Sequence, residues 1–184
     1  DYITEKFPIL YLKSTIASFV QIGYFSKAEG LANYPKVPAI PISGLMFSYN
    51  AGSSKDSANL RTEALCRFSF WLITLFYIAL VIAIKPLIKL LYGVDFLPAA
   101  EVVPWLYPAI VFYIQSLFLS SNIAAQGFNK SVFTIRLKSL PIVLISGYFL
   151  ITWFGIIGAA ITMSLMYFIL WIQYSIKYFQ ISNS

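Results

Sequence analysis

The chain has 184 residues, of which 59% are hydrophobic and only 11% are charged, and its mean hydropathy is +0.77. Soluble domains average about 25% charged residues, and a soluble protein of this size could not hide so much apolar surface. The composition therefore excludes an ordinary soluble domain and predicts a polytopic membrane protein. Because the basic residues behind the net charge of +6 lie between apolar runs, we interpret them as orientation signals and expect no nucleic acid partner.

The rarest residue types restrict the chemistry further. The sequence contains one cysteine, Cys66, and no histidine. An internal disulfide is therefore excluded, and the commonest general base and metal ligand is missing. The chain begins with Asp1 rather than Met and has no signal-peptide pattern, so we expect a fragment of a longer protein.

Six apolar runs, taken in chain order, predict an all-α bundle of about six membrane spans, each of about 20 residues. The first two are weaker, because residues 7–24 contain Lys13 and Gln21, and residues 31–50 contain Lys36 and three prolines. We interpret the second as a bent span, since proline removes a helical N–H, and bent spans often line transporter cavities. A kink that only improves packing is the open alternative. The four stronger runs, charged only near an end if at all, are residues 68–85, 102–125, 132–154 and 156–176.

Proline and glycine indicate where spans end. Pro86 follows the third run, where we expect the helix to bend or end. Gly155 and Gly158 predict a tight turn between the last two spans. Gly155 and Ala159 also have the small-xxx-small spacing that lets membrane helices approach closely.

Basic residues between the runs predict the orientation of the chain. If all six runs are spans, most basic residues fall on one side, which the positive-inside rule makes cytoplasmic. The first span then runs outward, and residues 85–101 are external. The cytoplasmic set comprises Lys55, Arg61, Arg67, Lys130, Arg136, Lys138 and Lys177, and the external set Lys27, Lys85 and Lys89.

Catalytic motifs are missing: the sequence has no Gly-rich phosphate loop, no Cys or His cluster and no Ser/His pair. We therefore expect no enzyme activity, no catalytic residue, no metal and no cofactor. The acidic residues form no intramembrane pair, and we interpret them as solvated loop charges. They are Asp1, Glu5, Glu29, Asp56, Glu63, Asp95 and Glu101.

A series of local motifs is more informative. In order, they read GYFSKA at 23–28, LANYP at 31–35, PISGLMF at 41–47, LYG at 91–93, FLPAA at 96–100, QG at 126–127 and FGIIGAA at 154–160. In this order and spacing they resemble the C-terminal half of bacterial polysaccharide flippases. These are the lipopolysaccharide or O-antigen exporters of the multidrug/oligosaccharidyl-lipid/polysaccharide (MOP) superfamily. The resemblance covers residues 23–181.

The resemblance implies a multi-pass protein of the bacterial inner membrane with two six-helix lobes. A central cavity between the lobes would accept a lipid-linked oligosaccharide, and the lobes would rock to expose it to each side in turn. This chain would be most of the second lobe. Its partners would be the lipid-linked glycan, membrane lipids and the missing N-terminal lobe.

Transport of a sugar head group requires a polar cavity, because each unpaired hydroxyl costs several kcal/mol in hydrocarbon. Tyr113 and Tyr148 could stack on sugar rings, and Lys13 or Arg136 could hold the anionic diphosphate, since intramembrane charges are functional candidates by default. The complete set of substrate-binding candidates is Lys13, Tyr113, Gln115, Asn122, Gln126, Arg136 and Tyr148.

Structural alternatives exist for these candidates. Lys13 could snorkel to the interface, Gln115 and Asn122 could hydrogen-bond neighbouring helices, and Arg136 could be a cytoplasmic anchor.

Alternative functions also remain. A drug/cation antiporter of the same superfamily would share the lobe design. A membrane enzyme of envelope polysaccharide assembly would need features missing here, a histidine for an acyltransferase or a large external loop with paired arginines for a polymerase.

Overall fold

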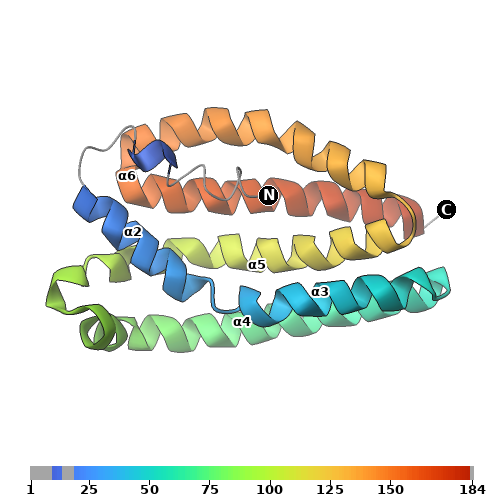
Figure 1. The fold of residues 1–184 in the computed structure, drawn as a ribbon, viewed down its shortest axis with the longest axis horizontal. Helices are drawn as coiled ribbons and strands as arrows, with labels where there is room; N and C mark the ends of the chain where they lie inside the picture. Colours follow the sequence, from blue (N-terminus) through green and yellow to red (C-terminus); the bar gives the residue numbers. More distant parts are fainter. Residues whose placement is uncertain (1–9, 14–18, 183–184) are drawn as a thin grey trace.

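The computed structural model describes residues 10–13 and 19–182, and all regular secondary structure in them is helical (Figure 1). The all-α class expected from the sequence is therefore confirmed. Besides the short helical segment at residues 10–13, the described helices are α2 (Phe19–Ala32), α3 (Lys36–Ala51), α4 (Lys55–Tyr92), the short 3-10 helix η1 (Val94–Phe96), α5 (Ala99–Ala125) and α6 (Asn129–Ser182).

Helices α4, α5 and α6 are long and apolar enough to cross a membrane, which supports a membrane protein. They contain the four stronger apolar runs. In its most apolar stretch α5 is 61% buried, whereas the figures for α4 and α6 are 28% and 17%. Helix α5 is therefore the centre of the bundle, and it contacts α2, α3, α4 and α6. The outer helices turn many large apolar side chains outward, as a lipid environment requires.

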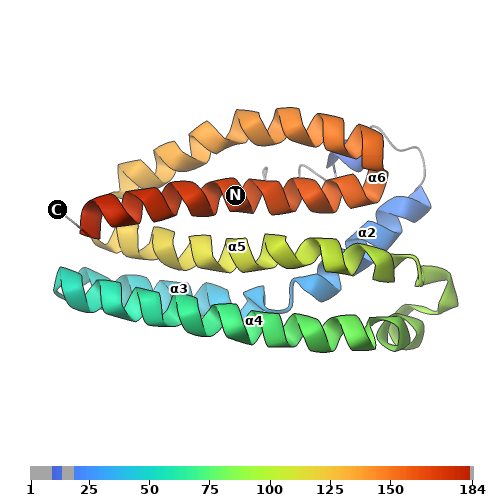
Figure 2. The same cartoon turned by 180° about the vertical axis from the view of Figure 1, so that it is seen from behind.

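Helix α6 folds back on itself at Gly155, whose φ of 56° and ψ of −128° interrupt the helix. We call residues 129–154 the N arm and residues 156–182 the C arm. Figure 2 shows the two arms side by side, with the C arm next to α5. A Cβ atom on Gly158 would collide with the carbonyl of Leu150 and would lie 3.0 Å from the Cα of Ile151. The turn therefore depends on glycine at both predicted positions.

The two weaker runs differ from the expected spans. Helices α2 and α3 have 14 and 16 residues, fewer than the roughly 20 that a span needs. Residues 33–35 form turns between them, because Pro35 disfavours a helical residue before it. The predicted bend is therefore a complete break. The described residues contain three helices long and apolar enough to cross a membrane, so the six-span bundle stays a prediction. The run at 7–24 lies partly outside the described residues.

The third span does not end at Pro86, but its last turns change direction, since Figures 1 and 2 show the far end of α4 at a steep angle to the rest of the helix. Helix α4 continues through this proline to Tyr92 and ends at Gly93, which has a φ of 90°. Long membrane helices tolerate proline where neighbours compensate for the lost backbone hydrogen bond. The expected external loop at 85–101 is consequently mostly helical, with η1 between α4 and α5.

Most connections between the helices lie at the two ends of the elongated bundle (Figure 1). Residues 51–55, residues 125–129 and the C-terminus lie at one end, which we call the basic end because Lys55, Lys130 and Lys177 are near it. Gly155 and the connection between α4 and α5 lie at the opposite end. The fold thus brings the loops of the predicted cytoplasmic set together, while the orientation itself stays a prediction.

Candidate functional site

Lys36 occupies an unusual place for a cation, because it begins α3 directly after the break, near the middle of the bundle (Figure 1). Its Nζ lies 4.3 Å from the ring centroid of Tyr113 on α5 and 5.2 Å from that of Tyr167 on the C arm. The two rings are themselves 5.0 Å apart. A cation over an aromatic face gains about 0.5–2 kcal/mol, so two helices hold this ammonium group in position.

The break also presents backbone and side-chain oxygens. The Tyr77 hydroxyl donates to the carbonyl of Ala32 at 3.2 Å, which satisfies one acceptor at the end of α2. The Asn33 Oδ1 atom is buried and has no hydrogen-bond partner among the described residues. A buried acceptor without a partner is costly, unless a ligand or water donates to it. The break therefore combines a held cation with an unsatisfied acceptor.

Glu29 corrects the expectation that the acidic residues are solvated loop charges. It lies in α2, one turn before the break, and is only 8% exposed. Phe25, Ala28 and Ala32 share its helical face and are completely buried. Apolar residues at spacings of three and four around Glu29 could have predicted its burial from the sequence, because such spacing places Glu29 on the packed side of a helix.

Arg136 provides a second cation, on the N arm. Its Nε donates to the hydroxyl of Tyr174 at 3.0 Å, which links the N arm to the C arm. Tyr174 follows Tyr167 by seven residues, so both lie on one face of the C arm, about 10 Å apart along the helix. The C arm thus presents one tyrosine to Lys36 and the next to Arg136.

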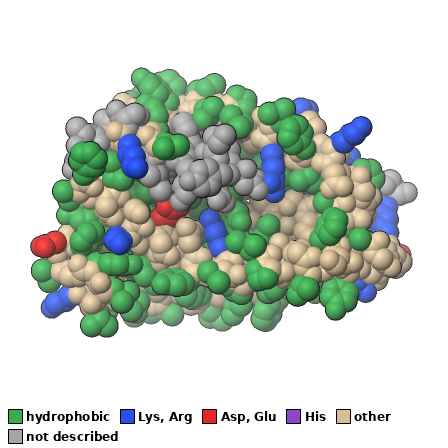
Figure 3. Space-filling view, viewed as in Figure 1, with side chains coloured by type: hydrophobic (Ala, Val, Ile, Leu, Met, Phe, Trp, Pro, Cys, Tyr) green, Lys and Arg blue, Asp and Glu red, His purple; other side chains and the backbone are tan. Residues whose placement is uncertain are grey.

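A cavity of about 240 Å³ lies beside Arg136 between the two arms, lined mainly by apolar side chains that include Val143 and Met166. Figure 3 shows this face hollowed between the N arm and α3, with basic side chains around the hollow. We group the residues at the break and those linked to them through the C arm as the central site, which comprises Glu29, Asn33, Lys36, Tyr113, Arg136, Tyr167 and Tyr174.

Other predicted candidates lie in a different place. Asn122 on α5 accepts from Asn50 at 3.0 Å and donates to Asn59 at 3.0 Å. Gln126 donates to Asn59 at 3.0 Å and to Asn122 at 3.2 Å. We call Asn50, Asn59, Asn122 and Gln126 the amide cluster, and it ties α3, α4 and α5 together at the basic end.

Gln115 also serves a helix contact, because its Nε2 donates to the Cys66 carbonyl at 2.9 Å and to Ser69 Oγ at 3.1 Å. For Gln115, Asn122 and Gln126 the geometry therefore favours a structural role over a role in substrate binding.

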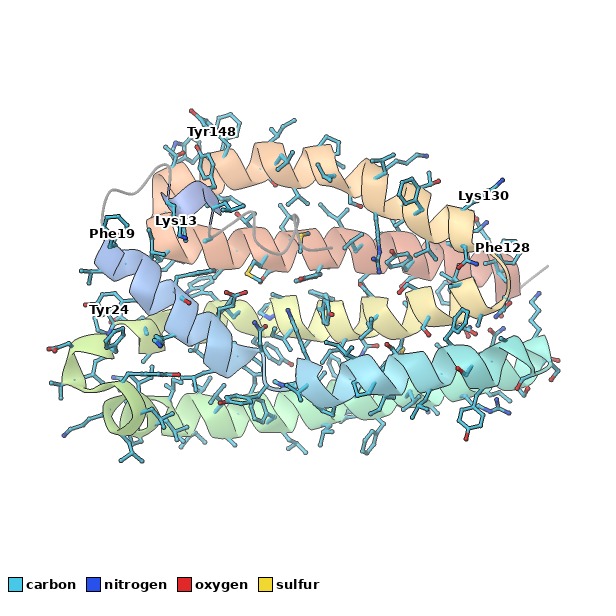
Figure 4. The ribbon with its side chains drawn as sticks, in the orientation of Figure 1. Lys13, Phe19, Tyr24, Phe128, Lys130 and Tyr148 are labelled. Carbon is cyan, nitrogen blue, oxygen red and sulfur yellow. The ribbon has the colours of Figure 1, made fainter. Side chains whose placement is uncertain are left out.

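Lys13 and Tyr148 lie near the opposite end of the bundle (Figure 4). Tyr148 is 52% exposed, and its ring centroid is 5.6 Å from that of Tyr11. Lys13 is exposed and belongs to the same short segment as Tyr11. Of the predicted candidates, the structure brings only Tyr113 and Arg136 into the central site.

Sequence reasoning missed Lys36 as a site residue, although the signal was present as a charge directly after Pro35 in an apolar run. Tyr167 and Tyr174 gave no local signal. Their role emerges only when the arms fold onto each other.

Comparisons with models of known protein families, with curated proteins and with solved structures find no match to this chain. The similarity to polysaccharide flippases therefore stays a prediction from the sequence motifs, and the function must be argued from the central site.

Proposed function

We propose that the chain is part of a membrane transporter that moves an anionic, lipid-linked oligosaccharide across the bacterial inner membrane. The observation that supports this best is Lys36, a cation held by two tyrosine rings at a break between two helices. Charged residues at membrane depth are costly and mark substrate pathways. Transporters commonly bind their substrates at discontinuous helices near the bilayer midplane.

The proposal includes a specific crossing pattern. Helices α2 and α3 act together as one discontinuous crossing, while α4, α5 and the two arms of α6 supply four more. The basic end faces the cytoplasm, because the loops that carry Lys55 and Lys130 meet there. The hollowed face of the central site is the side on which the remaining lobe of the transporter packs.

Five groups of the central site have roles in this mechanism. Lys36 and Arg136, from different helices, attract the diphosphate and the anionic groups beside it, since two separated cations suit an extended head group. Tyr113 and Tyr167 offer ring faces to the sugars. Asn33 Oδ1 accepts from a sugar hydroxyl and thereby reduces the cost of removing that hydroxyl from water. The lipid tail remains in the bilayer while the lobes rock.

The test compares Lys36→Gln with wild type in the two-lobe transporter that contains this chain, reconstituted into vesicles that contain a fluorescent polyprenyl-diphosphate oligosaccharide. We expect the flipping rate to fall at least about tenfold, equivalent to about 1.4 kcal/mol of lost interaction. Lys36→Arg should retain part of the activity because it retains the charge.

Lys27→Gln is the matched control, since Lys27 also lies on a ring, 4.8 Å from the centroid of Tyr92, but outside the central site. It should flip substrate at the wild-type rate. Wild-type flipping by a folded Lys36→Gln protein would contradict the proposal. Arg136→Gln and Lys13→Gln, in the same assay, test the two cations that the sequence indicated.

A further inference from the structure

A second concave site lies outside the central site, between the two arms of α6 at the basic end. This groove has a volume of about 440 Å³, and its lining contains three lysines and no carboxylate. Lys130 and Lys138 come from the N arm and Lys177 from the C arm, with Thr134 and Gln173 between them. Figure 4 shows Lys130 beside Phe128 at this end of the molecule.

The three lysines have no ion pair with any described residue. Lys177 lies over a neutral partner, with its Nζ 5.3 Å from the ring centroid of Phe128. Like charges converging on one concave surface repel each other, and they raise the local concentration of anions. The groove is therefore suited to a ligand that carries a phosphate or a similar anionic group.

The surface beside the groove indicates where that anion comes from. Lys130, Thr134 and Lys138 continue along the N arm at spacings of four and three residues into Ile142 and Ile145. These two isoleucines are 49% and 63% exposed. The same face of the helix is thus cationic at the basic end and apolar toward the middle of the membrane.

We propose that this groove binds an anionic phospholipid, with its phosphate among Lys130, Lys138 and Lys177 and its acyl chains along Ile142 and Ile145. A phospholipid carries its phosphate at the membrane surface and its acyl chains toward the middle, which matches the cationic and apolar parts of this helix face. Basic pockets between membrane helices on the cytoplasmic side bind such head groups. The site requires only that α6 crosses the membrane. It does not depend on which substrate the central site transports.

Native mass spectrometry of the full chain in detergent, titrated with phosphatidylglycerol or with phosphatidylcholine, tests the proposal. We expect wild type to bind phosphatidylglycerol at least about tenfold more tightly than phosphatidylcholine. The combined variant Lys130→Gln, Lys138→Gln and Lys177→Gln should lose this preference. The matched control removes the same charge at the opposite end through Lys27→Gln, Lys85→Gln and Lys89→Gln, and it should retain the preference.

Equal preference in wild type and the groove variant would overturn the proposal, as would equal loss in the control. Single Lys→Gln variants, each expected to weaken binding about threefold, keep the test valid if the combined variant does not fold. A parallel titration with inorganic phosphate separates the sources. One result would make the groove a site for soluble anions and overturn the lipid proposal. In it, inorganic phosphate stabilises wild type through these lysines, while wild type shows no preference for phosphatidylglycerol over phosphatidylcholine.

Discussion

The amide cluster and the central site both place polar side chains between apolar helices, yet their chemistry differs. In the amide cluster, all four NH₂ groups donate to side chains on the described helices. The central site instead contains the charged residues Glu29, Lys36 and Arg136. An amide oxygen without a described partner occurs in both regions, Asn50 Oδ1 in the amide cluster and Asn33 Oδ1 in the central site, so it is the charges that separate them. Neutral groups that satisfy each other stabilise a bundle, whereas charges at a helix break are expensive and need a function.

The comparison gives a rule for reading polar residues in membrane sequences. Asn122 and Lys36 are both conspicuous in apolar runs. Asn122 is neutral and hydrogen-bonds to two neighbouring helices, whereas Lys36 is charged and lies against two aromatic rings. The amide cluster is expected to affect stability first and transport second. The central site is expected to show the reverse order.

The largest effect on stability is predicted for Asn122→Leu. Asn122 is completely buried and makes hydrogen bonds with Asn50, Asn59 and Gln126. The substitution removes one hydrogen-bond partner from each of these three amides. It should lower the free energy of unfolding by about 2 kcal/mol. Thermal unfolding of the detergent-purified protein, followed by tryptophan fluorescence, measures the change.

Ser116→Ala is the matched control on the same helix. The Ser116 hydroxyl is also buried, but it has no hydrogen-bond partner among the described residues, so its removal should be neutral or slightly stabilising. If Asn122→Leu unfolds at the wild-type temperature but abolishes flipping, Asn122 belongs to a substrate site and the distinction between the two regions fails.

A smaller effect, on transport, is predicted for Tyr167. Tyr167→Leu removes the ring that faces Lys36 and the ring contact with Tyr113. A lost cation–π contact of about 1 kcal/mol corresponds to a fall of about fivefold in the flipping rate. Tyr167→Phe retains the ring and should transport nearly as well as wild type.

Phe168→Leu provides the control for Tyr167→Leu, because Phe168 is the next residue on the C arm and packs on Phe112 and Trp171. It should flip substrate at the wild-type rate. An equal loss in Phe168→Leu would mean that the transport defect reflects general packing of the arm.

Much of the fold followed from the sequence, because charge-free apolar runs can only be buried in lipid or protein. This reasoning located α4, α5 and both arms of α6, and Gly155 predicted the turn between the arms. The break before Lys36 was harder to place. Proline at 35, 38 and 41 predicted a bend, but the sequence did not show that the chain breaks before Pro35 or that Tyr77 of α4 donates to the carbonyl at the end of α2.

The site was less predictable, because its partners come from distant segments. Lys36 was interpreted as a charge that weakens the run at 31–50 as a span. Only the packing of α5 and the C arm against it shows that two tyrosine rings contact its ammonium group. Asn122 and Gln126 were singled out as polar residues at depth, since the sequence cannot show that their partner Asn59 lies opposite them. Glu29 was missed because a carboxylate is ordinarily exposed.

The smallest effect is predicted for Tyr178→Phe, at the edge of the amide cluster. The Tyr178 hydroxyl donates to Glu63 Oε1 at 2.9 Å, which joins the C arm to α4. The ring itself stays buried in the phenylalanine variant, so only the hydroxyl's contacts are lost, with Glu63 and, at 3.5 Å, with the Asn59 carbonyl. We expect the free energy of unfolding to fall by about 1 kcal/mol, with no change in the flipping rate of the folded protein.

Tyr49→Phe removes the same hydroxyl from a ring that is 69% exposed, and it should leave stability unchanged. The comparison is sharpest when both variants are measured for unfolding and for transport. A lower flipping rate in Tyr178→Phe at unchanged stability would show that the basic end takes part in transport. The polar residues there would then have to be assigned to a second part of the substrate path, because a purely structural contact changes the rate only through the amount of folded protein.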